Sequence, residues 1–282
     1  MKKRIITGVI ASLLVLILLF LRDTVVFNIA VAAIIVLAMF EALWATKIVT
    51  NKPLLIVCIL YSAIVPFFQM FKFYPAGVAI SSVFLLAMLL IVLIQHEKID
   101  LRQVTYAFTL SLLIPFAYSS LLYLNAIARY SEHYTETDSL FLLLFAMLGA
   151  WICDTGAYFT GTFFGKHKLA SKISPKKTVE GAIGGIVSVI TVDVCVGLVW
   201  QFGFVKDSGQ VNFALLILLA VFTSVCGMIG DLTFSFIKRE VKIKDFGNIM
   251  PGHGGLLDRT DSLIMTAPCT LLFVQFLPLL VR

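Results

Sequence analysis

The sequence predicts an all-α protein that crosses a membrane many times. Of its 282 residues, 60% are hydrophobic and only 13% are charged, whereas about a quarter of the residues in an ordinary soluble domain are charged. One water-soluble fold cannot hide so much apolar surface, so the medium around the helices must be lipid. A helix needs about 20 apolar residues to cross the hydrocarbon core of a bilayer, and the chain contains several such runs.

Nine apolar runs predict nine transmembrane helices with a cytoplasmic N-terminus. The first run follows Lys2, Lys3 and Arg4 in the manner of a secretory signal. It lacks a cleavage pattern, however, and another apolar run follows directly, so we expect it to remain as a span. The second and third runs are the least regular, because Glu41 and Pro66 lie near their ends. The predicted spans are residues 5–21, 25–44, 54–70, 76–95, 104–124, 139–161, 181–203, 211–236 and 262–281.

The basic residues give the predicted orientation. With this layout most of the 22 Lys and Arg residues lie on the cytoplasmic side, as the positive-inside rule requires. The outer segments hold only Arg22, Lys72, Arg129, Lys206 and Arg282. The net charge of +6 therefore reflects topology, with attraction to anionic lipid headgroups as a second possibility, and we expect no nucleic acid partner.

The two halves of the chain differ in their loops. Residues 1–138 have short, plain loops, whereas nearly all dense polar clusters fall within residues 150–262. We therefore expect residues 1–138, with spans one to five, to form a membrane scaffold. Residues 139–282, with spans six to nine, are expected to form the catalytic region.

Asp154 lies near the inner end of the sixth span. An Asp inside a span costs about 2.5–3.5 kcal/mol, so we expect it to face the bundle interior or water. Tyr158, Gly161 and Gly165 follow at helical steps on the same face. The alternative is structural: Gly161 and Gly165 form a helix-packing motif, and Asp154 is only a buried hydrogen-bond acceptor.

The loop after the sixth span has the composition of a polyphosphate site. Lys176 and Lys177 supply cations, Thr178 supplies a hydroxyl, and the glycines that follow permit close backbone approach. The spacing of a P-loop is absent. Alternatively, Thr178 caps the seventh helix and the lysines only set the topology.

The eighth span ends in a polar stripe. Asp231, Ser235 and Lys238 recur at helical spacing on one face, and Lys238 lies nearest the water boundary. A carboxylate below a cation suits a metal ion and a phosphate. The alternative is an ion pair within the helix, with Lys238 extending to the interface.

Residues 242–261 form the richest polar loop, directly before the last apolar run, and such loops are seldom only connectors. Asp258 and Asp261 are predicted to share a helical face at the start of the ninth span, where a helix N-terminus attracts anions. His253 is either a phosphate or base contact or a structural turn residue. Asp193, midway along the seventh span, is expected to bond a neighbouring helix rather than line a lipid cavity.

The predicted orientation brings all of these groups to the cytoplasmic boundary, and together they resemble one family. Their motifs are similar to the signature of the phosphatidate cytidylyltransferases, the CDP-diacylglycerol synthases, over residues 150–262. At Phe234 the chain departs from the family, whose members carry Glu there, so no metal or proton role passes to Phe234. The motifs are Asp154-x-Gly156-Ala157-Tyr158, Phe164-Gly165-Lys166, Ser174–Gly181, Ser235–Arg239, Lys244-Asp245, Pro251–Gly255 and Asp258–Asp261.

The resemblance implies an enzyme of the inner membrane whose active site faces the cytoplasm. It would transfer CMP from CTP to phosphatidic acid with Mg²⁺, and a second metal ion would lie nearby. A homodimer is also implied, with the first five spans contacting lipid and the partner. The residues implied in catalysis are Asp231, Asp258, Lys238 and Asp154; Asp231 and Asp258 would hold the metal, with Asp261 supporting them. The residues implied in substrate binding are Lys176, Lys177, Thr178, Ser235, Arg239, Lys244, Asp245, His253, Gly254, Gly255 and Arg259.

Two other classes of protein are open to the same residues. An ion-coupled transporter would also place Asp154, Asp193 and Asp231 within spans, but the paired repeats and broken helices of transporters are not visible. A non-catalytic scaffold subunit would account for the apolar bulk, but it would leave the charges at the inner face without a role.

Overall fold

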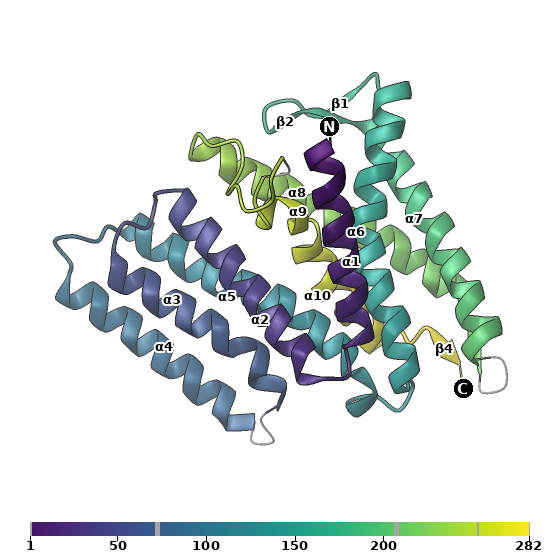
Figure 1. Ribbon diagram of the computed structural model, residues 1–282, viewed down its shortest axis with the longest axis horizontal. Coiled ribbons are helices and arrows are strands. Elements are labelled where there is room, and N and C mark those ends of the chain that lie inside the picture. Colours follow the sequence, from purple (N-terminus) through teal and green to yellow (C-terminus); the bar gives the residue numbers. More distant parts are fainter. Residues whose placement is uncertain (1, 71–73, 206–208, 253, 282) are drawn as a thin grey trace. The chain divides into compact units, whose positions relative to one another are not determined.

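The computed structural model describes residues 2–70, 74–205, 209–252 and 254–281, and its helices account for most of the chain (Figure 1). The chain divides into two compact units. The first holds Met1–Leu122 and Glu240–Arg259, and the second holds Tyr123–Arg239 and Thr260–Arg282. The loop before the last helix therefore belongs with the first five helices. The functional division between residues 1–138 and 139–282 stays a prediction.

The first unit is built from successive apolar helices. Its elements are α1 (Lys2–Phe20), α2 (Val25–Phe40), the π-helical turn η1 (Glu41–Ala45), α3 (Lys52–Ile64), the 3₁₀ turn η2 (Val65–Met70), α4 (Tyr74–Ile94) and α5 (Leu101–Asn125). Phe27, Val31 and Ile35 of α2 are buried at four-residue steps, so one face of α2 packs inward. Asn51 caps α3 by accepting a 3.0 Å hydrogen bond from the Leu54 amide. Helices α2, α3 and α4 lie side by side (Figure 1).

The second unit is centred on a close pair of long helices. Its elements are the 3₁₀ turn η3 (Ile127–Arg129), α6 (Glu136–Phe164), β1 (Lys168–Ala170), β2 (Ser174–Thr178), α7 (Val179–Trp200), the π-helical turn η4 (Gln201–Val205), β3 (Gln210–Val211), α8 (Phe213–Glu240), α10 (Leu263–Phe276) and β4 (Leu280–Val281). The short helix α9 (Leu257–Thr260) spans the boundary between the units. Two small antiparallel pairs, β1 with β2 and β3 with β4, were not predicted.

Glycines let α6 and α7 approach closely along their length. A Cβ on Gly161 would lie 2.9 Å from the Thr178 hydroxyl oxygen, and a Cβ on Gly185 would lie 2.8 Å from the Cys153 carbonyl oxygen. Small residues at helix contacts are typical of membrane proteins. The structural interpretation of Gly161 is therefore supported, whereas Gly165 is the C-cap residue that ends α6.

The predicted fold class, an all-α polytopic membrane protein, is confirmed. Each predicted span coincides with a helix, and within the described residues seven helices are long and apolar enough to cross a bilayer. The other two are shorter: the apolar part of α1 is Ile6–Phe20, and α10 ends at Phe276 rather than at residue 281. The last predicted span is too long because Leu280–Val281 pairs as β4 with β3.

Candidate active site

The predicted polar stripe of α8 lies beside the loop that precedes α7. Lys177 of β2 forms an ion pair with Asp231 of α8. The hydroxyl of Ser235, one turn later, donates a 3.2 Å hydrogen bond to the same carboxylate. The helical spacing therefore correctly predicted that Asp231 and Ser235 are neighbours. The cation beside Asp231 is Lys177 of the β1–β2 hairpin.

A second group of polar contacts involves Asp261 and Ser262, which lie between α9 and α10. The Asp261 carboxylate and the Lys238 ammonium group are 3.8 Å apart, and both residues are buried. Asp154 of α6 accepts a 2.9 Å hydrogen bond from the Ser262 hydroxyl. Burial is the main cause that raises the pKa of Asp261; the charges of Asp231 and Asp154 add to this, and Lys238 opposes it. The negative charges of Asp231 and Asp154 therefore both disfavour the charged form of Asp261.

The described ion pairs of α8 connect it to other elements. An ion pair within the helix would join Asp231 to Lys238, but the described ion pairs join Asp231 to β2 and Lys238 to Asp261. Both lysines therefore act between elements, where their charge balances a carboxylate that would otherwise be costly to bury.

Hydrogen bonds hold the β1–β2 hairpin at its turn and at the last residue of β2. The Thr178 hydroxyl accepts a 3.1 Å hydrogen bond from the Gly181 amide, so Thr178 caps α7 as one interpretation required. Arg239 of α8 donates from Nε to the Ile173 carbonyl oxygen at 3.3 Å. Lys176 is exposed on β2. The hairpin is therefore held with its lysines at the surface and beside α8.

In the first unit, Asp258 shapes the loop that precedes it. Its Oδ2 accepts hydrogen bonds from the Phe246 amide at 2.8 Å and from the Gly255 amide at 3.0 Å. Gly254 has a φ of 90°, a conformation that favours glycine, and its carbonyl oxygen accepts a 2.9 Å hydrogen bond from the Met250 amide. The Asp258 carboxylate thus joins two parts of the loop that precedes it, at Phe246 and at Gly255.

The remaining predicted site residues lie on or beside this loop. Lys244, Asp245 and Arg259 are exposed, and His253 lies outside the described residues. The prediction that Asp258 and Asp261 share a helical face is wrong. Asp258 lies in α9, which ends at Thr260, whereas Asp261 lies in the turn between α9 and α10.

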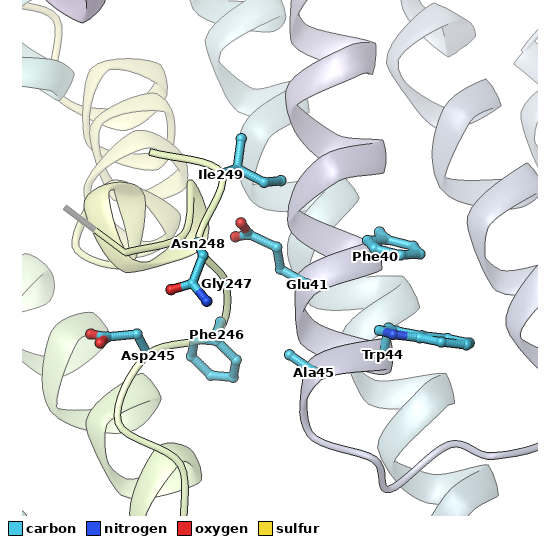
Figure 2. Close-up of a pocket in the computed structure, with 9 residues that line it drawn as sticks. All are labelled: Phe40, Glu41, Trp44, Ala45, Asp245, Phe246, Gly247, Asn248 and Ile249. Carbon is cyan, nitrogen blue, oxygen red and sulfur yellow. The ribbon is translucent and has the colours of Figure 1, made fainter. Parts of the chain in front are cut away.

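A small cavity of about 310 Å³ lies between the end of α2 and this loop (Figure 2). Glu41 points from the helix toward the loop, whereas Phe40 and Trp44 extend from another side of the helix. The residues that line the cavity are Phe40, Glu41, Trp44, Ala45, Asp245, Phe246, Gly247, Asn248 and Ile249.

Comparison with known proteins decides the family. Residues 2–277 match the model of the cytidylyltransferase family. The chain belongs to the cytidylyltransferase family. It is 32% identical to a phosphatidate cytidylyltransferase of Bacillus subtilis over 98% of this chain and 97% of that protein. It is 42% identical to the Haemophilus influenzae protein of the same name over 61% of this chain and 57% of that protein. It is 46% identical to one from Staphylococcus epidermidis over 48% and 49% of the two chains.

The acidic residues of this family member fit a hard divalent cation by their chemistry. Asp231, Asp258 and Asp261, the predicted metal residues, carry carboxylate oxygens, the ligands that Mg²⁺ prefers. In the part of the chain that the structure describes, however, no three acidic, His or Cys side chains converge closely enough to hold a metal. Lysines instead neutralise Asp231 and Asp261.

Sequence reasoning missed one residue of this chain, Glu41. It is only 3% exposed, and its carboxylate accepts hydrogen bonds from the Leu256 and Leu257 amides. The signal was present, because an acidic residue inside an apolar span is costly without a partner. The same argument identified Asp154 as a candidate site residue. Glu41 was used only to describe the second predicted span as irregular.

Proposed function

We propose that this chain is a phosphatidate cytidylyltransferase, which transfers CMP from CTP to phosphatidate and gives CDP-diacylglycerol and pyrophosphate. The observation that carries the proposal is the similarity to the Bacillus subtilis phosphatidate cytidylyltransferase, which extends over nearly the full length of both chains. The polytopic helical fold suits a lipid substrate, because the diacylglycerol part of phosphatidate stays in the bilayer.

The reaction brings two anions together, so electrostatic stabilisation is the main demand on the site. An oxygen of the lipid phosphate attacks the α-phosphorus of CTP. The bond from that phosphorus to the oxygen bridging to the β-phosphate breaks, and pyrophosphate leaves. Since a phosphomonoester has its second pKa near 6, the lipid phosphate is largely dianionic at neutral pH and needs no general base.

The lysines of the second unit meet this demand. Lys177 and Lys238 each neutralise a carboxylate in the described state. When nucleotide binds, they would exchange these partners for phosphate oxygens, and Arg239 and Lys176 would add positive charge beside them. Asp231 and Asp258 would hold Mg²⁺, with Asp261 in support. The cation supplies further neutralisation of the triphosphate, and a second cation would add to it.

We place the site on the cytoplasmic face of the inner membrane and the active protein as a homodimer. The placement rests on the excess of Lys and Arg in the inner segments, where CTP is available. The homodimer rests on the resemblance of the sequence motifs alone.

The test is a direct assay on the purified full-length protein in lipid nanodiscs. With CTP, Mg²⁺ and phosphatidate, we expect pyrophosphate release and label from the α-phosphate of CTP in the lipid. Asp231→Asn should lower kcat at least about a hundredfold without changing the thermal unfolding midpoint by more than a few degrees. A protein that ignores CTP but moves solute across proteoliposomes would be a transporter, and the proposal would fail.

A further inference from the structure

Glu41 is a buried carboxylate in the first unit that no step of the proposed reaction uses. It begins the π-helical turn η1 directly after α2. Its Oε1 accepts a 3.0 Å hydrogen bond from the Leu256 amide, and its Oε2 accepts a 2.9 Å bond from the Leu257 amide. Leu257 is the first residue of α9, and Leu256 directly precedes it. One side chain therefore holds both of them from a helix 215 and 216 residues earlier in the chain.

The loop has glycines where it passes this carboxylate. A Cβ added to Gly247 or to Gly255 would collide with the carboxyl group of Glu41. The side chain could move away only by giving up its hydrogen bonds to the two amides. Both glycines are therefore required for the loop to close around Glu41, because only glycine has no Cβ.

Asp258 completes the arrangement from within the loop. It accepts hydrogen bonds from Phe246 and Gly255, while Glu41 accepts those from Leu256 and Leu257. Two carboxylates thus accept hydrogen bonds from four amides of one segment. Gly255 donates to Asp258, and a Cβ on it would meet Glu41. A shift of Glu41 would move Leu256 and Leu257, which connect Gly255 directly to Asp258.

We propose that Glu41 is a positioning residue that sets the shape of residues 245–252 and 254–258 and, through it, the orientation of Asp258. The effect on catalysis rests on the proposed function, whereas the effect on the loop does not. A π-helical turn in an otherwise α-helical span is a feature often found at functional sites, and here it presents Glu41 to the loop.

The decisive variant is Glu41→Gln in full-length protein in lipid nanodiscs. Glutamine keeps the shape of the side chain, but an NH₂ group replaces one oxygen and faces a backbone N–H. Hydrogen exchange at the Leu256 and Leu257 amides should become at least tenfold faster. The kcat for CMP transfer should fall at least tenfold, while the thermal unfolding midpoint changes little. Glu97→Gln, an exposed glutamate after α4, is the matched control and should change none of these quantities.

A double-mutant cycle separates the loop effect from a general loss of packing. Gly247→Ala should lower kcat by itself, because its Cβ displaces the Glu41 carboxylate. In a Glu41→Ala background the same substitution should have little further effect. Independent, multiplicative losses would overturn the proposal.

The outcomes distinguish this inference from the proposed function. A wild-type protein without transferase activity would defeat the proposed function, and the exchange rates would still test Glu41. An active wild type together with an active Glu41→Gln variant whose exchange rates are unchanged would overturn the role of Glu41. Faster exchange with unchanged kcat would also overturn it, because the loop would then not need Glu41 for the reaction.

Discussion

Lys177 and Asp231 neutralise each other, and this pairing defines the most direct test at the scale of single residues. Lys177→Met would leave the Asp231 carboxylate without its cation and remove a group expected to contact phosphate. Hydrogen bonds to charged groups contribute about 1.5–3 kcal/mol, so kcat/KM for CTP should fall roughly tenfold to a hundredfold. Steady-state kinetics of pyrophosphate release would measure this. Lys98→Met, which changes an exposed lysine, is the control, and equal effects of the two variants would contradict the assignment.

Single residues also show where sequence reasoning reaches its limit. Helical spacing correctly predicted that Ser235 and Asp231 are neighbours, because both lie on one continuous helix. The same reasoning failed for Asp258 and Asp261, since Asp258 lies in α9 and Asp261 in the turn that follows it. The contacts of Glu41 with Leu256 and Leu257 join distant parts of the chain, and no local periodicity carries that information.

At the scale of elements, the close packing of α6 against α7 makes a quantitative prediction. A Cβ on Gly185 would meet the Cys153 backbone carbonyl, which belongs to α6 and cannot turn away as a side chain can. Gly185→Ala should therefore destabilise the protein by about 1–3 kcal/mol, seen as a lower midpoint of thermal unfolding in detergent. Gly203→Ala is the control because a Cβ there meets nothing within 4 Å. Equal shifts for both variants would argue against the described helix contact.

Asp193 makes a second prediction for α7. It is fully buried, and neither carboxyl oxygen has a hydrogen-bond partner, so the expected bond to a neighbouring helix is not found. Burying an unsatisfied polar group costs about 1–3 kcal/mol. Asp193→Val should raise the thermal unfolding midpoint with unchanged transferase activity, whereas Asp193→Asn should give little gain. If the valine variant instead lost activity, Asp193 would have a role in the reaction.

The elements themselves were largely predictable, because length and hydropathy specify where a chain can cross lipid. Each predicted span coincides with a helix, but its exact ends depend on contacts outside the span. The C-terminal residues pair as β4 with β3, and the segment around Lys177 folds as a hairpin. Neither pairing shows in composition, since each strand has only two to five residues.

For the whole molecule, the sequence predicts which loops face the cytoplasm. Single cysteines placed at Glu97 or Lys244, in a variant without the five native cysteines, should be blocked by a membrane-permeant maleimide only. A cysteine at Glu132 should also react with an impermeant maleimide applied to spheroplasts. Labelling of Lys244 from outside would invert the predicted topology and remove the proposed site from its supply of CTP.

The proposed function depends most on the proposal that Asp231 of α8 and Asp258 of α9 each contribute to binding the cation that accompanies CTP. Electron paramagnetic resonance of Mn²⁺ with CTP and the full-length protein tests it directly, because Mn²⁺ takes the oxygen ligands that suit Mg²⁺. Asp231→Asn and Asp258→Asn should each weaken Mn²⁺ binding at least tenfold, while Asp100→Asn, at an exposed acid before α5, should not. Wild-type affinity in either of the first two variants would contradict the claim.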